Sequence, residues 1–176
     1  FEGSFAQTLA HDLVPIINSP AQADFWCSNA DNRAYVLHID TGMNRMGLTP
    51  EQAVAHSQSG APSPCLVLSH FACADEPDHP LNARQIKLFE ALKPSFAGIE
   101  ASLANSGGIF LGSSCHHDLT RPGIALYGGE PGAHLPNRMH TVVTAETRVL
   151  LIRNAKAGES VSYGAAHVLT RDSRIA

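Results

Sequence analysis

The sequence is poor in lysine and in charge. Three of its 176 residues are lysine, and charged residues make up 16%, whereas an average soluble domain has about 25%. Disorder over most of the chain is excluded, because disordered chains combine high charge with few apolar residues and 44% of this sequence is hydrophobic. No run approaches the roughly 18 to 20 consecutive apolar residues of a membrane-spanning helix.

A basic surface and a cysteine framework are also lacking. The net charge is −4 and the nine arginines are scattered, which argues against electrostatic binding to nucleic acid. The spacing of the four cysteines matches neither a zinc site nor a disulfide pattern, so we expect free thiols, with Cys65 and Cys73 buried. His116–Asp118 is the densest group of possible metal ligands, but adjacent side chains diverge, and we expect a solvated loop and no metal.

Apolar stretches alternate with helical patterns over most of the chain. The expected strands are 13–17, which we expect to be buried, 34–40, 65–71 and 99–103. The expected helices are 21–26, 50–57, 81–92 and 107–111, with 124–127 either helical or extended. Continuous apolar strands separated by helices predict a parallel sheet of the α/β class.

The composition changes after Tyr127. Glycine and proline are concentrated in the next stretch, which predicts a linker over 129–140. From Val143 to Leu151 apolar and polar residues alternate, which predicts a half-exposed strand. We therefore expect an α/β domain over 1–128 and the start of a β-rich domain over 141–176. The first residue is not methionine and the last lies in a strand-like stretch, so we expect a fragment.

Polar motifs follow the ends of the expected strands. Asp40–Arg45 follows the second strand, Ser69–Glu76 the third and Asn105–Gly108 the fourth, and Arg121–Gly123 lies beyond them. Ligands bind at the carboxyl ends of the strands in both barrels and open α/β sheets. Four motifs in equivalent positions predict a ligand site at this edge of the sheet.

Each motif also has a purely structural explanation. Asp40 is typical of an Asx turn, and Arg45 of a surface ion pair. His70 at the end of an apolar strand is typical of a hydrogen-bonded core histidine, and Arg121 before proline and glycine of a turn. Asn105 is typical of a helix N-cap, although the serine and glycines after it also offer N–H groups to a phosphate. No single motif decides between these explanations.

Five motifs, taken together and in order, resemble those of alanine racemase, the pyridoxal-phosphate (PLP) enzyme family that interconverts L- and D-alanine. They are Asp40–Gly47, Ser69–Ala72 with Ala74–Glu76, Ala104–Ser106, Arg121–Gly128 and Val161–Ala165. The resemblance spans almost the whole chain. It implies the C-terminal part of a (β/α)8 TIM barrel over 1–128, followed by a β domain. It also implies a cytoplasmic homodimer that makes D-alanine for peptidoglycan.

The resemblance further implies which residues hold pyridoxal 5′-phosphate. Arg121 matches the arginine that faces the pyridine nitrogen, and Arg45 the one that hydrogen-bonds the phenolic oxygen. Arginine stays protonated and so does not readily give that nitrogen a proton, which suits proton removal and return at the substrate. Ser106, with the backbone of Gly123 and Ile124, matches the phosphate-binding set.

The catalytic residues implied by the resemblance are Tyr163, His70 and Arg121. Tyr163 matches one of two bases, donated across the dimer interface, and His70 matches the histidine that supports the pyridine-facing arginine. A tyrosine has an ordinary pKa near 10, so its use as a base at neutral pH requires positive charge nearby. Arg121 and His70 are the expected suppliers of that charge.

Two positions depart from the family pattern. Many members have a carbamylated lysine seven residues before Arg45, where this chain has His38. The family's cofactor lysine, in a Lys-Ala-Asp-Ala-Tyr-Gly-His-Gly context, is missing, and Lys87, Lys93 and Lys156 are expected to be solvated. Without that lysine there is no covalent attachment and no second base, so we expect the chain to be inactive alone.

Two alternatives stay open. A non-catalytic PLP-binding or homeostasis protein of the same barrel type would share the phosphate contacts, although the alternating pattern after Tyr127 argues against it. A non-catalytic interaction protein is the other alternative.

Overall fold

The computed structural model describes residues 2–132 and 139–176, so 133–138, inside the expected linker, lie outside the described residues. The chain divides into two compact units, residues 1–142 and 143–176. Within the described ranges, every helix is too short or too polar to cross a membrane.

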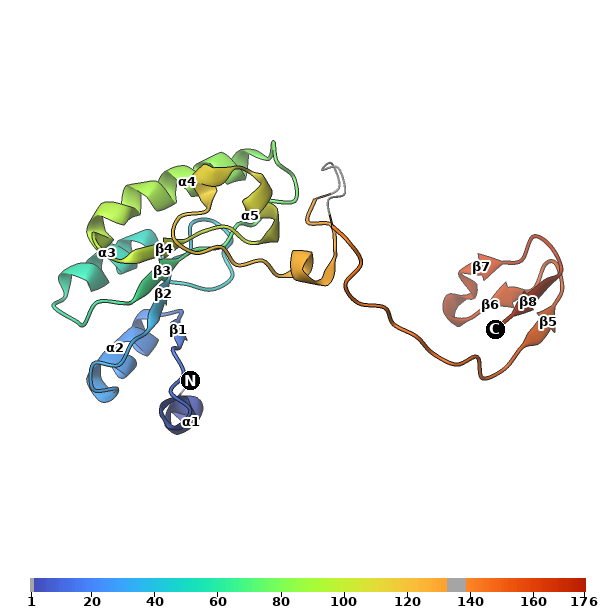
Figure 1. Cartoon of the computed structure of the whole chain (residues 1–176), viewed down its shortest axis with the longest axis horizontal. Helices are drawn as coiled ribbons and strands as arrows, with labels where there is room; N and C mark the ends of the chain where they lie inside the picture. Colours follow the sequence, from blue (N-terminus) through green and yellow to red (C-terminus); the bar gives the residue numbers. More distant parts are fainter. Residues whose placement is uncertain (1, 133–138) are drawn as a thin grey trace. The chain divides into compact units, whose positions relative to one another are not determined.

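A four-stranded parallel sheet forms the centre of the first unit (Figure 1). The strands, in spatial and sequence order, are β1 (Ile16–Ile17), β2 (Val36–His38), β3 (Leu66–Leu68) and β4 (Glu100–Ser102). Each lies within an expected strand, and helices connect them, so the predicted α/β class is confirmed. The sheet is an open arc, and no barrel closes within the described residues.

The helices begin where local signals place them. In chain order they are η1 (Glu2–Ser4), α1 (Phe5–Ala10), α2 (Pro20–Asn29), α3 (Pro50–Gln58), α4 (Pro80–Leu92), η2 (Lys93–Phe96), α5 (Ser106–Phe110), η3 (Ser113–Cys115) and η4 (Ile124–Tyr127). Proline opens α2, α3 and α4, where its missing N–H breaks no helical hydrogen bond. The caps before them are the side chains of Ser19, Thr49 and His79, each of which accepts a backbone N–H.

Alternation along the strands separates a core face from a second face. Ile17, Leu37, Val67 and Ala101 are in register across the sheet, and all four belong to the main apolar core. Trp26 of α2, Ala53 of α3 and Phe89 of α4 belong to the same core. His38, Leu68 and Ser102 form the next row in register, so their side chains lie on the opposite face.

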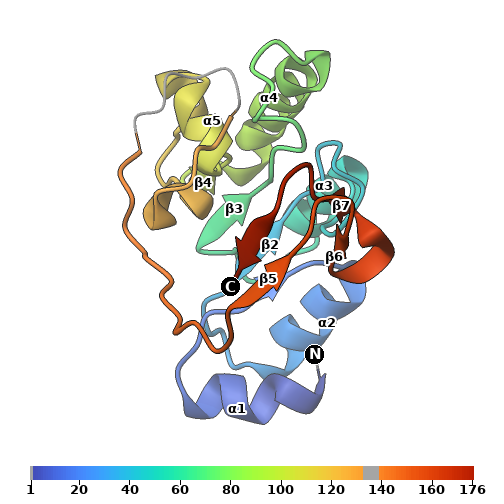
Figure 2. The same ribbon diagram turned by 90° about the vertical axis from the view of Figure 1, so that its right-hand side faces the viewer.

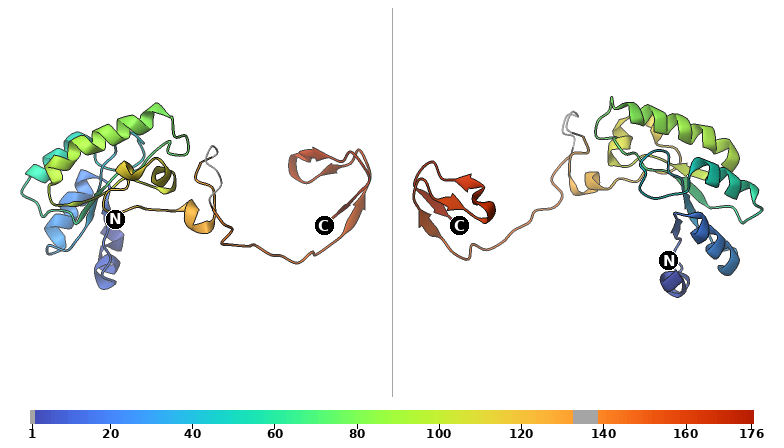
Figure 3. Two further views of the ribbon diagram at one scale, coloured as in Figure 1. Left: turned by 45° about the horizontal axis from the view of Figure 1, so that its top comes forward. Right: turned by 180° about the vertical axis from the view of Figure 1, so that it is seen from behind.

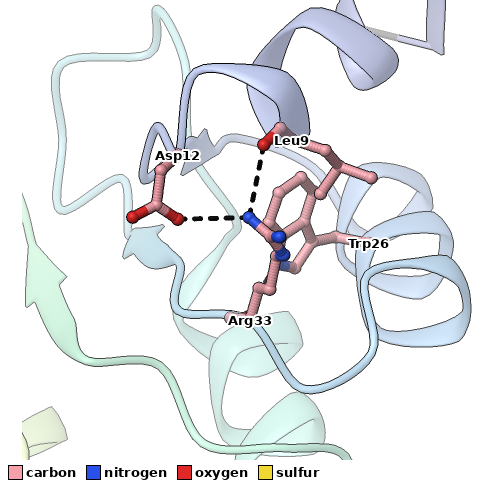
Figure 4. A network of polar contacts seen from close by, with 4 residues as sticks. All are labelled: Leu9, Asp12, Trp26 and Arg33. Carbon is pink, nitrogen blue, oxygen red and sulfur yellow. Dashed lines mark hydrogen bonds and ion pairs between the residues drawn. The ribbon is translucent and has the colours of Figure 1, made fainter.

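The segment around α1 is tied to the chain just before β2. Arg33 donates to Asp12 Oδ1 at 3.1 Å and to the carbonyl of Leu9 at 3.4 Å. The Trp26 indole donates to the carbonyl of Arg33 at 3.2 Å. Figure 4 shows the two contacts of the Arg33 side chain, with Asp12 and Leu9. In Figures 1 and 2, α1 and α2 lie toward the β1 end of the sheet, and α4 and α5 toward the β4 end.

The prediction of a buried first strand is wrong. Leu13, Val14 and Ile16 are 58%, 50% and 47% exposed, and only Ile17 is fully buried. The cause is topological, because β1 is an edge strand with β2 as its only neighbour in the described sheet. A continuous apolar stretch indicates a strand that is covered on both faces, which this edge position is not.

The second unit is small and antiparallel. β5 (Arg153–Ala155) pairs with β8 (Ser173–Ile175), and β6 (Ser160–Val161) pairs with β7 (His167–Val168), as the red arrows in Figure 3 show. η5 (Tyr163–Ala165) lies between β6 and β7.

The predicted strand from Val143 to Leu151 is not formed. These residues have no regular secondary structure, and Leu150 is 97% exposed. Alternation describes which face of a strand is apolar, but a strand also needs a neighbour for its backbone hydrogen bonds. No described residue pairs with this segment.

Two further expectations about burial need correction. All four cysteines are free, as predicted, but Cys65 is exposed, because it lies at the start of its strand, and Cys73 is only half-buried. His117 does not lie in a solvated loop, since its side chain is 5% exposed and packs edge-on against Phe89. Asp118 accepts the N–H of Ala101, which ties this loop to the sheet. Within the described ranges no three metal-ligating side chains are grouped.

Candidate active site

A cavity of about 280 Å³ opens beyond the carboxyl ends of β3 and β4. It is lined by parts of the loops after these strands, by the start of α5 and by the segment after Arg121. The structure brings five of the predicted site residues together around this cavity, namely His70, Ser106, Arg121, Gly123 and Ile124.

Arg121 supplies a half-buried positive charge. Its guanidinium donates to Ser102 Oγ and to the carbonyl of Ser69. Burial lowers the pKa of Arg121 to about 10, so the group remains protonated at neutral pH. Within the described ranges no carboxylate forms an ion pair with it. A half-buried cation with only neutral partners favours an anionic or electron-rich ligand.

His70 lies between two hydrogen-bond donors. Its Nδ1 is 3.5 Å from Arg121 Nη2, and its Nε2 is 3.3 Å from Asn105 Nδ2. Asn105 is held in this orientation because its Oδ1 accepts the N–H of Gly108 at 2.9 Å, as the N-cap of α5. Burial, then Arg121 and Arg45, lower the pKa of His70. A protonated ring would present N–H groups to both donors, so the site favours the neutral ring.

A second histidine, His38, is also neutral. It lies on the face of the sheet that carries Ser102. Its Nδ1 donates to Asn18 Oδ1 at 2.7 Å, and only 9% of the residue is exposed. Burial, followed by the charges of Arg121 and His70, lowers the pKa of His38 to about 4. The ring is therefore uncharged at neutral pH, with Nδ1 carrying the proton.

Ser106 organises the other end of the cavity. Its Oγ accepts the N–H of Gly123 at 2.7 Å and that of Ala125 at 3.3 Å. The N–H of Ile124, between them in sequence, meets no acceptor in the described part of the chain. Gly123 differs from the expectation, because its N–H is donated to Ser106 and is not free for a ligand. The hydroxyl proton of Ser106 and the Ile124 N–H remain as donors.

Two glycines shape this end of the cavity. A Cβ on Gly107 would lie 2.8 Å from the carbonyl of Ala74, so the close contact between these loops requires glycine. A Cβ on Gly123 would meet only Ser106 Oγ, at 3.9 Å, and would extend into open space. Glycine at these positions keeps backbone and hydroxyl donors accessible, which is an arrangement that suits a phosphate.

Three candidate residues lie outside the cavity lining. Asp40 forms an Asx turn, which is the structural explanation considered for it above. Its Oδ1 accepts the N–H groups of Gly42 and Met43, both at 2.8 Å. Arg45 is exposed, although its charge contributes to the lowered pKa values of His38 and His70. Tyr163 belongs to the second unit and is 98% exposed.

None of the lysines is among the described residues that line the cavity. Lys87 lies on an exposed position of α4, and Lys93 is 3.6 Å from Glu90. Lys156 is in the second unit, 2.7 Å from Asp172. The solvated positions predicted for all three are confirmed.

Sequence reasoning missed the buried polar residues behind the cavity, above all Gln85 on α4. Gln85 is fully buried, and its amide contacts the loops after both β2 and β3. A signal was available, because position 85 falls on the same helix face as Phe89 and Leu92. A glutamine on an otherwise apolar face indicates a polar partner inside the protein.

The comparisons with known proteins agree on one family. The family profile "Alanine racemase, N-terminal domain" matches residues 1–131. Alanine racemase of Rhizobium meliloti is 51% identical over 173 residues, which are 94% of this chain and 46% of that protein. Alanine racemase of Rhodospirillum rubrum is 47% identical over 99% of this chain and 49% of that protein.

A solved structure agrees with the sequence comparisons. The crystal structure of alanine racemase from Bartonella henselae with covalently bound pyridoxal phosphate has a TM-score of 0.79 and 30% identity. The match covers 97% of this chain and 50% of that one. The chain thus spans about half the length of the relatives it matches, and its open sheet is part of their barrel fold. This chain belongs to the alanine racemase family.

Proposed function

We propose that the protein carrying this chain is a PLP-dependent amino-acid racemase that interconverts L- and D-alanine. The observation that carries the proposal is the pairing of Arg121, a half-buried guanidinium without a carboxylate partner among the described residues, with the anion-suited end of the cavity at Ser106. The family membership supports it, and so does the PLP named for the relative from Bartonella henselae.

The residues around the cavity fit PLP. The Ser106 hydroxyl and the Ile124 N–H would hold the phosphate, with the open space at Gly123 leaving room for it. Arg121 would face the pyridine nitrogen, and Arg45 the phenolic oxygen. When bound, PLP supplies a ring that stabilises negative charge at the α-carbon of the amino acid.

Arg121 would control how strongly the ring withdraws electrons. With a pKa of about 10, its guanidinium keeps its own proton at neutral pH and donates a hydrogen bond without transferring it. A pyridine nitrogen that stays unprotonated withdraws electrons less strongly. The arrangement therefore favours removal and return of the α-proton over reactions that break other bonds.

The proton-transfer roles rest on residues of both units. We propose Tyr163 as one of two bases, donated to the cavity of a second subunit in a homodimer. His70 would keep Arg121 in place as a neutral partner, since its ring lies 3.5 Å from the guanidinium. The second base and the covalent attachment of PLP require a lysine, and none of the three lysines of this chain is among the described residues that line the cavity.

The remaining features of the proposal concern context. Residues 1–128 would form the C-terminal part of a (β/α)8 barrel, 129–140 a linker and 141–176 the start of the β domain. A cytoplasmic enzyme that supplies D-alanine for peptidoglycan is consistent with a family whose members include biosynthetic alanine racemases.

The experiment is a racemisation assay on the full-length protein that contains this chain. Purified protein with PLP is incubated with L-alanine, and D-alanine is measured by chiral chromatography. The proposal predicts equal amounts of both enantiomers at equilibrium. Tight PLP binding without any D-alanine would overturn it and favour a non-catalytic PLP-binding protein.

A further inference from the structure

We propose that Gln85, on α4, is a positioning residue for His70 and Arg121. The inference rests on the function proposed above and adds a residue outside the cavity to it. Gln85 is fully buried, although glutamine is seldom buried unless its amide is hydrogen-bonded. It is not among the residues that line the cavity, but it contacts the loop that carries His70.

The amide of Gln85 has its polar hydrogens and its oxygen engaged. Nε2 donates to the carbonyl of His70 at 2.9 Å and to Thr41 Oγ1 at 3.2 Å. Oε1 accepts the N–H of Ala72 at 3.0 Å. A carbonyl only accepts and an N–H only donates, so these two backbone partners fix the orientation of the amide.

The first arm of this network, the bonds from Gln85 to residues 70 and 72, positions His70. By binding the carbonyl of residue 70 and the N–H of residue 72, one side chain fixes the backbone on both sides of Phe71. That backbone determines where the His70 ring lies between Arg121 and Asn105.

The second arm, which runs from Gln85 through Thr41 and Ser69, positions Arg121. Because Thr41 accepts from Gln85, its hydroxyl proton is free to be donated to Ser69 Oγ, 2.7 Å away. Thr41 and Ser69 are buried, at 4% and 1% exposure. The carbonyl of Ser69 in turn accepts from the Arg121 guanidinium. A displaced Ser69 would therefore move the group that is proposed to face the pyridine nitrogen.

The test compares two substitutions on the same helix in the full-length protein loaded with PLP. Gln85→Met keeps a similar volume and removes every hydrogen bond of the amide. Asn82→Leu is the matched control, because Asn82 is also buried on α4 but donates to the carbonyls of Cys73 and Glu76, beyond the 70–72 segment. Both variants should lower Tm, so the loss of stability is shared between them.

The readouts separate positioning from stability. For Gln85→Met we expect kcat to fall about 10- to 100-fold with KM changed less than about threefold, since small displacements of catalytic groups have effects of this size. The His70 ring pKa, measured by NMR, should rise toward its ordinary value as the ring becomes less buried and moves away from Arg121 and Arg45. The Ala72 N–H should exchange faster with solvent. Asn82→Leu should leave the His70 pKa and the Ala72 exchange rate at their wild-type values.

Equal His70 pKa values and equal Ala72 exchange rates in the two variants would overturn the proposal, because Gln85 would then have only a structural role. If Gln85→Met fails to fold, Thr41→Val removes only the hydrogen bonds of Thr41 with Gln85 and Ser69. An unchanged kcat in this variant would contradict the proposed effect of Gln85 on Arg121. Neither NMR readout needs turnover. A wild-type protein that makes no D-alanine therefore overturns the proposed function, while the NMR comparison still tests Gln85.

Discussion

The two units of the chain differ in how far they bury their proposed site residues. In the first unit, Arg121 and Ser106 are buried or half-buried and bonded to backbone or hydroxyl groups within the same unit. In the second unit, Tyr163 is 98% exposed. The groups proposed to hold the cofactor are therefore positioned by the local sheet and its loops, whereas the proposed base is not positioned by its own unit.

The same contrast holds for apolar side chains. The first unit buries Leu37, Val67 and Phe89 in one core. The second unit exposes Val149, Leu150 and Leu151 at 62%, 97% and 61%, next to one another in sequence. Contiguous exposed apolar residues mark surfaces that another segment or chain covers. On the proposed roles, the first unit is a preformed binding half, and the second is a proton-transfer half that depends on other surroundings.

The largest expected effect follows from that division. The chain of 176 residues alone, given PLP and L-alanine, should form no D-alanine above the uncatalysed rate, whereas the full-length protein should exceed that rate at least about 10⁶-fold. The reason is that none of its lysines is among the described residues that line the cavity. Chiral chromatography measures both samples. If the lone chain formed D-alanine and Tyr163→Phe abolished this activity, the proposed division into a binding half and a dependent proton-transfer half would be contradicted.

Within the first unit, Arg121→Gln should have the next largest effect. The variant removes the positive charge while keeping a hydrogen-bond donor, and we expect racemisation by the full-length protein to fall about 100- to 1000-fold. Arg84→Gln, on an exposed position of α4, is the control and should retain wild-type rates. Equal rates for the two variants would show that the Arg121 guanidinium does not act on the cofactor.

The third prediction concerns pH and His38. Its pKa is about 4 in the folded protein and near 6.5 when unfolded, so the unfolded chain binds its proton first as the pH falls. The stability that depends on a neutral His38 is fully present above about pH 6.5 and is lost toward pH 4, by about 3 kcal/mol at most.

Urea unfolding at several pH values measures this loss. His38→Gln should reduce the slope of the free energy of unfolding between pH 6.5 and 4, while His11→Gln, an exposed histidine, should leave it unchanged. His56, His70 and His117 also have lowered pKa values, so part of the slope should remain. An unchanged slope in His38→Gln would mean that this ring is not held neutral by burial.

The smallest effect is expected for Ser106→Ala. The variant removes the acceptor for the N–H groups of Gly123 and Ala125 and one donor for the phosphate. We expect the affinity for PLP to fall about tenfold, measured by fluorescence titration of the full-length protein. Ser114→Ala, at an exposed position, is the control. An affinity equal to wild type would place the phosphate elsewhere.

Much of the first unit could be predicted from sequence because its signals are local. Buried parallel strands appear as apolar stretches, and three of the four polar motifs directly follow one, so the edge of the sheet that carries the cavity could be identified. Asp40 shows the limit of such motifs, because its side chain closes an Asx turn. The sequence cannot show which of two local roles a side chain takes.

The remaining features depend on contacts far apart in sequence. Gln85 acts on loops 13 to 44 residues away, so neither motif nor spacing connects it with the site. His117 is buried because Phe89 lies beside it. The alternation from Val143 to Leu151 indicates which side of a strand would be apolar. It does not indicate which other strand would pair with it.

The most direct test of the preformed binding half is a crystal structure of the full-length protein with PLP. The account predicts the phosphate within hydrogen-bonding distance of Ser106 Oγ and the Ile124 N–H. It also predicts the Arg121 guanidinium against the pyridine nitrogen, still bonded to Ser102 and the Ser69 carbonyl. A phosphate bound away from Ser106, or a pyridine nitrogen that faces a group other than Arg121, would contradict it.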